Sequence, residues 1–257
     1  MLKELTKADW LKLLNLPESR VPVALILRGT RNLGSQYQAV LPFFTNVTDI
    51  GAPNGIFEDV LVGDLRGWPV GFACVYGSSM ASEIVHVFGV LGTRVVIQTG
   101  NCGALVDECA AGDLFLAEQA FSGEGAAQYY RPGNPWVTAT PGLFHSRAIS
   151  RFAPQACRRG AIYTTAALLA EGADDLERWF QQGFAAVDME TAATYAVAEH
   201  FGMDRLAILY VFDNPRRQEH LLLTDADKEA RRALGNKRMR ELAFDLAVEL
   251  SANFGRK

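Results

Sequence analysis

Short buried strands alternate with helical stretches along this chain, and that alternation restricts the fold more than any other feature. Apolar runs a few residues long end at glycine or polar positions and are followed by stretches with helical spacing. The expected strands occupy residues 23–27, 60–65, 70–75, 95–97, 160–165, 184–187 and 206–212. No linker divides them. The pattern predicts an α/β fold in which a central mixed β-sheet is flanked by helices, with residues 1–257 forming one domain.

Four stretches are expected to be helices, and each has apolar residues along one stripe or a small-residue face. The first forms a short amphipathic N-terminal segment, and the residues up to 20 lead from it into the sheet. The expected helices occupy residues 2–14, 77–91, 191–198 and 225–254. Residues 98–104 are expected to form a polar turn punctuated by glycines. Residues 121–137 read as a long loop, either the wall or lid of a pocket or a surface loop with packed aromatics.

Composition excludes several classes of function. The net charge is −4 and no long run of Lys or Arg occurs, so nucleic-acid binding is not expected. The four cysteines follow no metal-ligand or disulfide spacing, which indicates reduced thiols and no metal site. Neither a signal peptide nor a membrane-spanning run is found. We therefore expect a cytoplasmic protein whose partners are small molecules or further copies of itself.

The candidate site centres on the junction between residues 184–187 and the helix that follows. Asp188 and Glu190 lie two positions apart there, with Met189 between them. One interpretation is that these acids simply complement the dipole of the following helix. The other is that a carboxylate at the strand end accepts hydrogen bonds from a sugar diol while methionine packs beside the sugar.

Three further strand ends carry polar residues. Gly29 ends the first strand between Arg28 and Arg31, and a glycine there allows backbone N–H groups to approach an anion. The alternative interpretation is that these residues form a solvated turn that binds no anion. Ser78 and Ser79 open the helix at 77–91, where serine is by default a capping residue.

The third strand end is Asp213, which ends the strand at 206–212 and begins an Asp-Asn-Pro sequence typical of turns. A terminal acid of this kind is often only a turn former. Its position after a long apolar run also allows a functional carboxyl.

The sequence Val187-Asp188-Met189-Glu190-Thr191-Ala192-Ala193 resembles the V-E-M-E-A/S-A signature of the hexameric nucleoside phosphorylases. That family includes purine nucleoside phosphorylase, uridine phosphorylase and related nucleosidases. Further matches follow in the family's order over roughly residues 20–250: Gly29, the 77–82 loop, Gly100 with Gly103 and Ala104, the strand at 113–117, and Asp213.

The resemblance implies the phosphorylase fold, with sites beside a dimer interface that a neighbouring subunit completes. It therefore implies a homodimer at least, and a hexamer as the larger assembly. The substrates would be a nucleoside and inorganic phosphate, with no other cofactor.

The resemblance also implies a role for each matching residue. Glu190 would bind the 2′- and 3′-hydroxyls of ribose, and Met189 would pack on the sugar. Asp213 would protonate the leaving purine, and Lys228 falls close to a family arginine that assists this acid. Leu168 occupies the region of an aromatic residue that stacks on the base, so this contact would be aliphatic.

The phosphate-binding positions depart from the family. Gln98 stands where the phosphorylases have an arginine, and Asn101 replaces a serine or threonine. A neutral amide can hydrogen-bond to a phosphate oxygen but supplies no charge. The family's P-G-D loop reads Arg28-Gly29-Thr30, and the family's following arginine aligns with Leu33. The loop at residues 77–82 is one residue short.

These observations favour reversible phosphorolysis of a purine nucleoside, with Gly29 and either Arg28 or Arg31 binding phosphate. A nucleosidase is the first alternative, because Gln98 removes a charge; against it, residues 28–34 hold no carboxylate to activate water. A uridine phosphorylase is the second, although the uracil-reading Gln and Arg are absent near Glu171. A nucleoside-binding protein without catalysis is the third.

Overall fold

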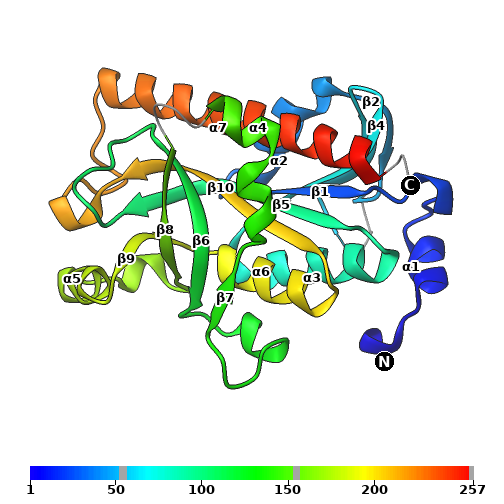
Figure 1. The fold of residues 1–257 in the computed structure, drawn as a ribbon, viewed down its shortest axis with the longest axis horizontal. Helices are drawn as coiled ribbons and strands as arrows, with labels where there is room; N and C mark the ends of the chain where they lie inside the picture. The colour runs from blue at the N-terminus through cyan, green and yellow to red at the C-terminus, as the bar shows by residue number, and fades with distance from the viewer. Residues whose placement is uncertain (52–56, 153–156, 255–257) are drawn as a thin grey trace.

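The computed structural model describes residues 1–51, 57–152 and 157–254, and within them ten strands form one sheet (Figure 1). The strands are β1 Ala24–Gly29, β2 Phe44–Asp49, β3 Val60–Leu65, β4 Trp68–Val75, β5 Val95–Ala104, β6 Leu114–Ser122, β7 Trp136–Thr138, β8 Cys157–Thr164, β9 Phe184–Asp188 and β10 Asp204–Asp213. Their order is β10-β6-β8-β9-β5-β1-β4-β3-β2, with β7 beside β6. The predicted mixed sheet is confirmed, since parallel and antiparallel pairs both occur.

One part of the sheet closes on itself. Strand β10 pairs with β6 at the end of the order and also with β5, so β5, β10, β6, β8 and β9 form a ring. The register of these pairs places Val187, near the end of β9, and Asp213, at the end of β10, opposite Gly103 of β5. The ring therefore brings Val187 and Asp213 to opposite sides of one glycine.

Helices cover both faces of the sheet. They are α1 Lys7–Leu13, α2 Leu33–Val40, α3 Gly77–Leu91, α4 Arg147–Phe152, α5 Ala173–Gln181, α6 Thr191–His200 and α7 Ala226–Phe254. Figure 1 shows α7, α4 and α2 along one side of the sheet and α3 and α6 along the other. Short 3₁₀ turns η4 Ala126–Tyr129, η6 Leu168–Ala170 and η7 Pro215–Arg217 join these elements near the site.

Strand β1 shows how the two faces are built. All six of its residues are buried, and consecutive side chains point to opposite faces. Ile26 belongs to the core beneath α7, whereas Leu25 and Leu27 belong to the core beneath α3 and α6. The same alternation sets the face of the sheet toward which each side chain at the end of β1 points.

Several sequence expectations are confirmed and others are wrong. The β3–β4 hairpin turns at Arg66 and Gly67, both with positive φ; residues 52–56, which precede it, lie outside the described part. The expected continuous helix over residues 2–14 is wrong, because Thr6 ends the lead-in and caps a separate α1 by accepting a hydrogen bond from the Asp9 N–H. Strands β2 and β7 and helices α2, α4 and α5 were not foreseen.

The expected turn at residues 98–104 is also wrong. These residues continue β5, which pairs with β10 up to Gly103. Gly100 allows the strands to approach closely, since a Cβ there would lie 3.2 Å from the Gly29 carbonyl oxygen. Glycines in this segment therefore serve close packing within a strand.

Candidate functional site

Asp188 and Glu190 have different environments, although only one residue separates them. The Asp188 carboxylate accepts hydrogen bonds from Thr164 Oγ1 (2.8 Å), the Glu190 N–H (3.2 Å), the Thr191 N–H (2.8 Å) and Thr191 Oγ1 (2.5 Å). It therefore fits the helix-start interpretation, capping the first turn of α6 and tying it to β8. Burial raises the pKa of Asp188, and these hydrogen bonds oppose the rise.

Glu190 turns away from its helix and toward α3. Its Oε1 accepts a hydrogen bond from the Gly77 N–H at 2.8 Å, and the side chain makes no cap for α6. Burial first, and then the nearby Asp188 charge, raise the pKa of Glu190 to about 8. A carboxyl that is free of helix capping and held at a strand end is available to a ligand.

Gly29 makes room for this carboxyl. A Cβ at position 29 would lie 2.8 Å from Glu190 Oε2 and 3.1 Å from Gln98 Nε2, so any side chain would displace both. Gln98 is fully buried beneath the site, where Nε2 donates to the Thr99 carbonyl and Oε1 accepts from Thr194 Oγ1. Gly29, Gln98 and Glu190 thus pack together on the α3–α6 face of the sheet.

A hollow of about 1050 Å³ opens beside Met189 and Gly77, the residue whose N–H donates to Glu190; Glu190 itself does not line it. Met189 and the first residues of α3 form its inner end, so Met189, Ser78 and Ser79 are brought together as the sequence suggested. The Ser78 hydroxyl donates to the Met189 carbonyl at 2.7 Å and fixes α3 against the β9–α6 junction. Ser79 is exposed toward the hollow, and neither serine caps α3.

The segment between β6 and β7 supplies the opposite wall of the hollow. Residues 124–126 and 128–130 line it, with Tyr129 90% exposed. Glu124 organises this wall by accepting hydrogen bonds from Ser122 Oγ (2.8 Å) and from the Ala126 N–H. The interpretation of residues 121–137 as a pocket wall therefore agrees with the structure.

Arg28 and Arg31 lie on different sides of the sheet. Arg28 points to the α7 face, where it is buried, its Nη1 is 3.5 Å from Met239 Sδ, and its guanidinium lies over the Tyr210 ring. Burial lowers its pKa, which Tyr210 partly offsets. Arg31 is exposed beyond the end of β1 and lies over the ring of Tyr76, which lines the hollow. Arg31 thus lies beside the hollow, whereas the charge of Arg28 acts on Glu190 and lowers the pKa of that carboxyl against the rise caused by burial.

Asp213 lies at the other end of the site. Its carboxylate sits over Gly103, where a Cβ would be 3.3 Å from Asp213 Oδ1 and 3.2 Å from Val187 Cγ1. Among the described residues no hydrogen bond to this carboxylate is found. Burial raises the pKa of Asp213 to about 6, and the positive charges of Arg232 and Lys228 oppose the rise.

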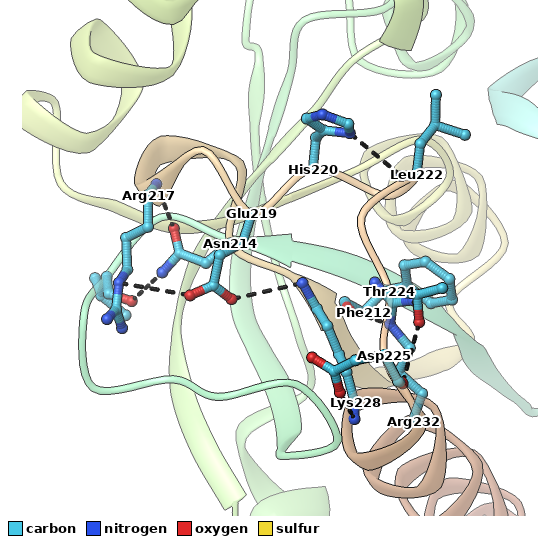
Figure 2. Close-up of polar contacts among 11 residues, drawn as sticks. Phe212, Asn214, Arg217, Glu219, His220, Leu222, Thr224, Asp225, Lys228 and Arg232 are labelled. Carbon is cyan, nitrogen blue, oxygen red and sulfur yellow. Dashed lines mark hydrogen bonds and ion pairs between the residues drawn. The ribbon is translucent and has the colours of Figure 1, made fainter.

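Lys228 and Arg232 of α7 contact β10 and the segment that follows it (Figure 2). Lys228, in the first turn of α7, has a buried side chain with Nζ 3.6 Å from Glu219 Oε2. Arg232 donates to the Phe212 carbonyl through Nε at 2.6 Å. Glu219 in turn raises the pKa of Asp213, so it works against the two cations.

Glu171 was not predicted as a site residue. It follows η6, its Oε1 is buried, and that oxygen has no hydrogen-bond partner within the described residues. Burial raises the pKa of Glu171 to about 7, and the charge of Asp213 adds to the rise. A single acid in a turn carries no sequence pattern, so only the three-dimensional arrangement reveals it.

The remaining predicted residues lie outside the hollow. Gly100 belongs to the interior of β5, and its N–H faces Met239 Sδ at 3.3 Å. Asn101 is exposed on the same strand, and Leu168 is half-buried in η6. Among residues 1–51, 57–152 and 157–254 no cluster of His, Cys, Asp or Glu suits a metal ion. No helix in the same part of the chain is long and apolar enough to cross a membrane.

A family model described as the Phosphorylase superfamily matches residues 58–247, which is most of the chain. The chain belongs to the phosphorylase superfamily. The matched region contains β9 with Glu190, β10 with Asp213, and the start of α3. The nucleoside phosphorylase family predicted from the sequence is therefore confirmed, and with it the class of enzyme, a pentosyltransferase.

Curated relatives in the superfamily agree with this assignment. A "Purine nucleoside phosphorylase DeoD-type" from Clostridium beijerinckii is 23% identical over 246 residues, covering 92% of this chain and 98% of the relative. A protein of the same description from Geobacillus kaustophilus is 26% identical over 179 residues, covering 68% of this chain and 71% of its own length.

Solved structures in the superfamily share the fold. A crystal structure of uridine phosphorylase from Vibrio fischeri superposes with a TM-score of 0.73, covering 92% of this chain and 94% of its own, at 20% identity. Similarity at that level establishes the phosphorylase fold for this chain and leaves the choice of base to the site.

Proposed function

We propose that this protein catalyses the reversible phosphorolysis of a nucleoside, with purines favoured over uridine, to give the free base and ribose 1-phosphate. One observation carries the proposal. Two buried carboxyls, Glu190 and Asp213, lie at the ends of β9 and β10, whose Val187 and Asp213 both pair with Gly103 in a fold of the phosphorylase superfamily. We assign the first carboxyl to the sugar and the second to the base.

Glu190 is the group for the ribose diol. Its carboxyl accepts one hydrogen bond from Gly77 and keeps further acceptor capacity on Oε2, which faces the space above Gly29. Met189 lines the hollow beside it and packs on the sugar. Positive charge develops on the sugar as the glycosidic bond breaks, which favours the ionised form of Glu190 in the transition state.

Asp213 is the acid for the leaving base. Its raised pKa of about 6 leaves a fraction of the carboxyl protonated near neutral pH. The proton passes to the imidazole-ring nitrogen of a purine as the bond to ribose breaks, so the base leaves uncharged. Uracil has no imidazole ring to receive it, which is why purines are favoured.

Phosphate binds at the open start of α3. A helix N-terminus attracts anions through free N–H groups and the helix dipole. Ser79 faces the hollow there, and Arg31 lies over Tyr76, the N-cap residue of that helix. Arg31 returns the positive charge that Gln98 does not supply, so we propose phosphate binding through Arg31, Ser79 and backbone N–H groups.

Hydrolysis is the second candidate, and Gln98 is the observation that favours it. The buried amide of Gln98 is already bonded to Thr99 and Thr194, so it adds no charge for phosphate. Water would then attack the sugar in place of phosphate. The absence of a carboxylate at residues 28–34 weighs against water activation.

Product analysis separates these functions. Adenosine, inosine and uridine are incubated with the protein in the presence and absence of phosphate. We expect free base only with phosphate, ribose 1-phosphate as co-product, and faster turnover of the purine nucleosides. Free ribose formed at the same rate without phosphate would identify a nucleosidase. Faster uridine cleavage would overturn the purine assignment, and binding without any product would indicate a non-catalytic role.

We also propose that the protein acts as a homo-oligomer, a dimer at least, in the cytoplasm. The hollow is open on one side and carries the exposed Tyr129 on its wall. A second copy seated there would complete the site from its own residues. Light scattering coupled to size-exclusion chromatography measures the assembly, and a monomer with full activity would contradict the proposal.

A further inference from the structure

Arg28 is a buried cation for which the phosphorolysis described above has no use. Its side chain is 6% exposed, and no carboxylate of the described residues lies within ion-pair distance of its guanidinium. Its Nη1 lies 3.5 Å from Met239 Sδ, and a thioether sulfur is only a weak acceptor. The ring of Tyr210 adds a contact at 5.8 Å. A buried charge without an opposite charge is costly to keep, so Arg28 is a candidate for an anion contact.

The titratable groups nearest to Arg28 do not supply the missing negative charge. Tyr210, Cys74 and Glu190 are the groups whose charges act on it. Burial raises the pKa of Tyr210 and raises the pKa of Cys74 to about 12. The pKa of Glu190 is about 8. All three groups are therefore mainly uncharged at neutral pH, and the protein itself does not neutralise Arg28.

A cavity of about 20 Å³ lies beside Arg28, between the sheet and helices α2 and α7. Figure 1 shows these two helices along the same side of the sheet. Gln36 of α2 and Asn236 of α7 line the cavity with Arg240, a second cation, and no acidic residue among the described ones lines it. A cavity of this volume holds one water molecule or one monatomic ion. Inorganic phosphate and a nucleoside are both larger.

We propose that this cavity binds a monovalent anion of the size of chloride, which neutralises Arg28 and joins β1 to α2 and α7. A guanidinium and side-chain amides offer N–H donors to an anion. A halide suits such a site, because a monovalent ion loses less hydration energy on burial than a multiply charged one. The site is distinct from the proposed phosphate site, because Arg28 points to the α7 face of the sheet, whereas Ser79 faces the hollow at the start of α3.

The anion is expected to act as a structural ligand. The residues that line the cavity come from β1, β4, β5, α2 and α7, which are far apart in the chain. The unfolded chain therefore has no such site. A ligand that binds only the folded state stabilises it by mass action, and the stabilisation grows with ligand concentration.

Thermal unfolding in different sodium salts at equal ionic strength tests the site. Chloride and bromide fit the cavity, whereas isethionate is too large for it. We expect the wild-type Tm to be higher by about 2–4 °C in the halides than in isethionate, and to rise further with halide concentration. Arg28→Met keeps a long side chain and removes the charge, so the difference between salts should disappear.

Arg66→Met is the matched control. Arg66 is an exposed arginine in the β3–β4 turn that pairs with Asp245 of α7, outside the cavity. This variant should keep the halide response of the wild type. An equal response in the wild type and Arg28→Met would overturn the proposal, because the halides would then act elsewhere.

A second measurement needs no variant and decides the question even if Arg28→Met does not fold. Crystals of the wild type are grown with sodium bromide, and anomalous scattering is recorded at the bromine absorption edge. We expect an anomalous peak within contact distance of the Arg28 guanidinium. Density for a water molecule without an anomalous peak would show that the cavity holds no anion and would overturn the site.

Discussion

The two ends of the site are built differently. At the sugar end, Asp188 makes four hydrogen bonds and Glu190 accepts one from Gly77, so β8, β9, α3 and α6 are fixed to one another. At the proposed base end, the Asp213 carboxylate has no hydrogen bond within the described residues. The Glu190 end is therefore held in place by the fold, whereas the Asp213 carboxylate keeps its acceptor capacity.

The largest expected effect is at the base end. Asp213→Asn removes the transferable proton and keeps the shape, so kcat/KM for purine nucleosides should fall by about 10²–10⁴-fold. Asp107→Asn is a control, because Asp107 is an exposed acid that pairs with Arg216 nearby. Steady-state kinetics with inosine and adenosine measure the effect. Near-normal turnover in Asp213→Asn would reduce this residue to a turn former.

Glu190→Gln tests the sugar end. The amide can still accept from the Gly77 N–H, but it lacks the negative charge near the developing ribosyl cation. We expect kcat/KM for ribonucleosides to fall on the order of a hundredfold or more. Glu83→Gln serves as the control, since Glu83 lines the same hollow. If Glu190→Gln turns over like the wild type, its carboxylate has no part in catalysis.

Arg31→Ala and Arg28→Met separate the two faces of the sheet. A charge-assisted hydrogen bond contributes about 1.5–3 kcal/mol, so losing Arg31 should raise the KM for phosphate by at least about tenfold. Arg28→Met should leave this KM unchanged, because Arg28 faces Met239 on the α7 side. The reverse pattern in phosphate titrations would show that phosphate is bound through Arg28.

The smallest expected effect concerns stability. Glu190 has a pKa of about 8 in the folded protein, against 4.5 for the free side chain. Protonated Glu190 therefore stabilises the folded state. This contribution is complete below pH 4.5 and is lost as the pH rises through 8. Glu190→Gln does not titrate, so at pH 9 it should be more stable than the wild type by at least about 1 kcal/mol, or about 2–4 °C in Tm. Scanning calorimetry at pH 5 and pH 9 should show a difference that grows with pH.

Features set by neighbouring residues could be predicted from the sequence, whereas features set by contacts between distant residues could not. The strand ends at Asp188 and Asp213 and the helix from Gly77 follow from apolar runs and the residues that end them, and the structure confirms them. Residues 98–104 were wrongly predicted to form a turn, because glycines and polar residues usually mark turns. Pairing with β10 and close packing on β1, both remote in sequence, hold it extended.

The sequence by itself determined the mixed α/β architecture, the family, and the two acids at strand ends, because strand periodicity and short motifs are properties of neighbouring residues. Only the tertiary structure decided that Asp188 caps a helix while Glu190 faces Gly77, that Arg28 and Arg31 serve opposite faces, and that Val187 and Asp213 meet at Gly103. Those facts depend on which strands pair and on which face of the sheet each side chain emerges. Contacts between residues far apart in the chain set both.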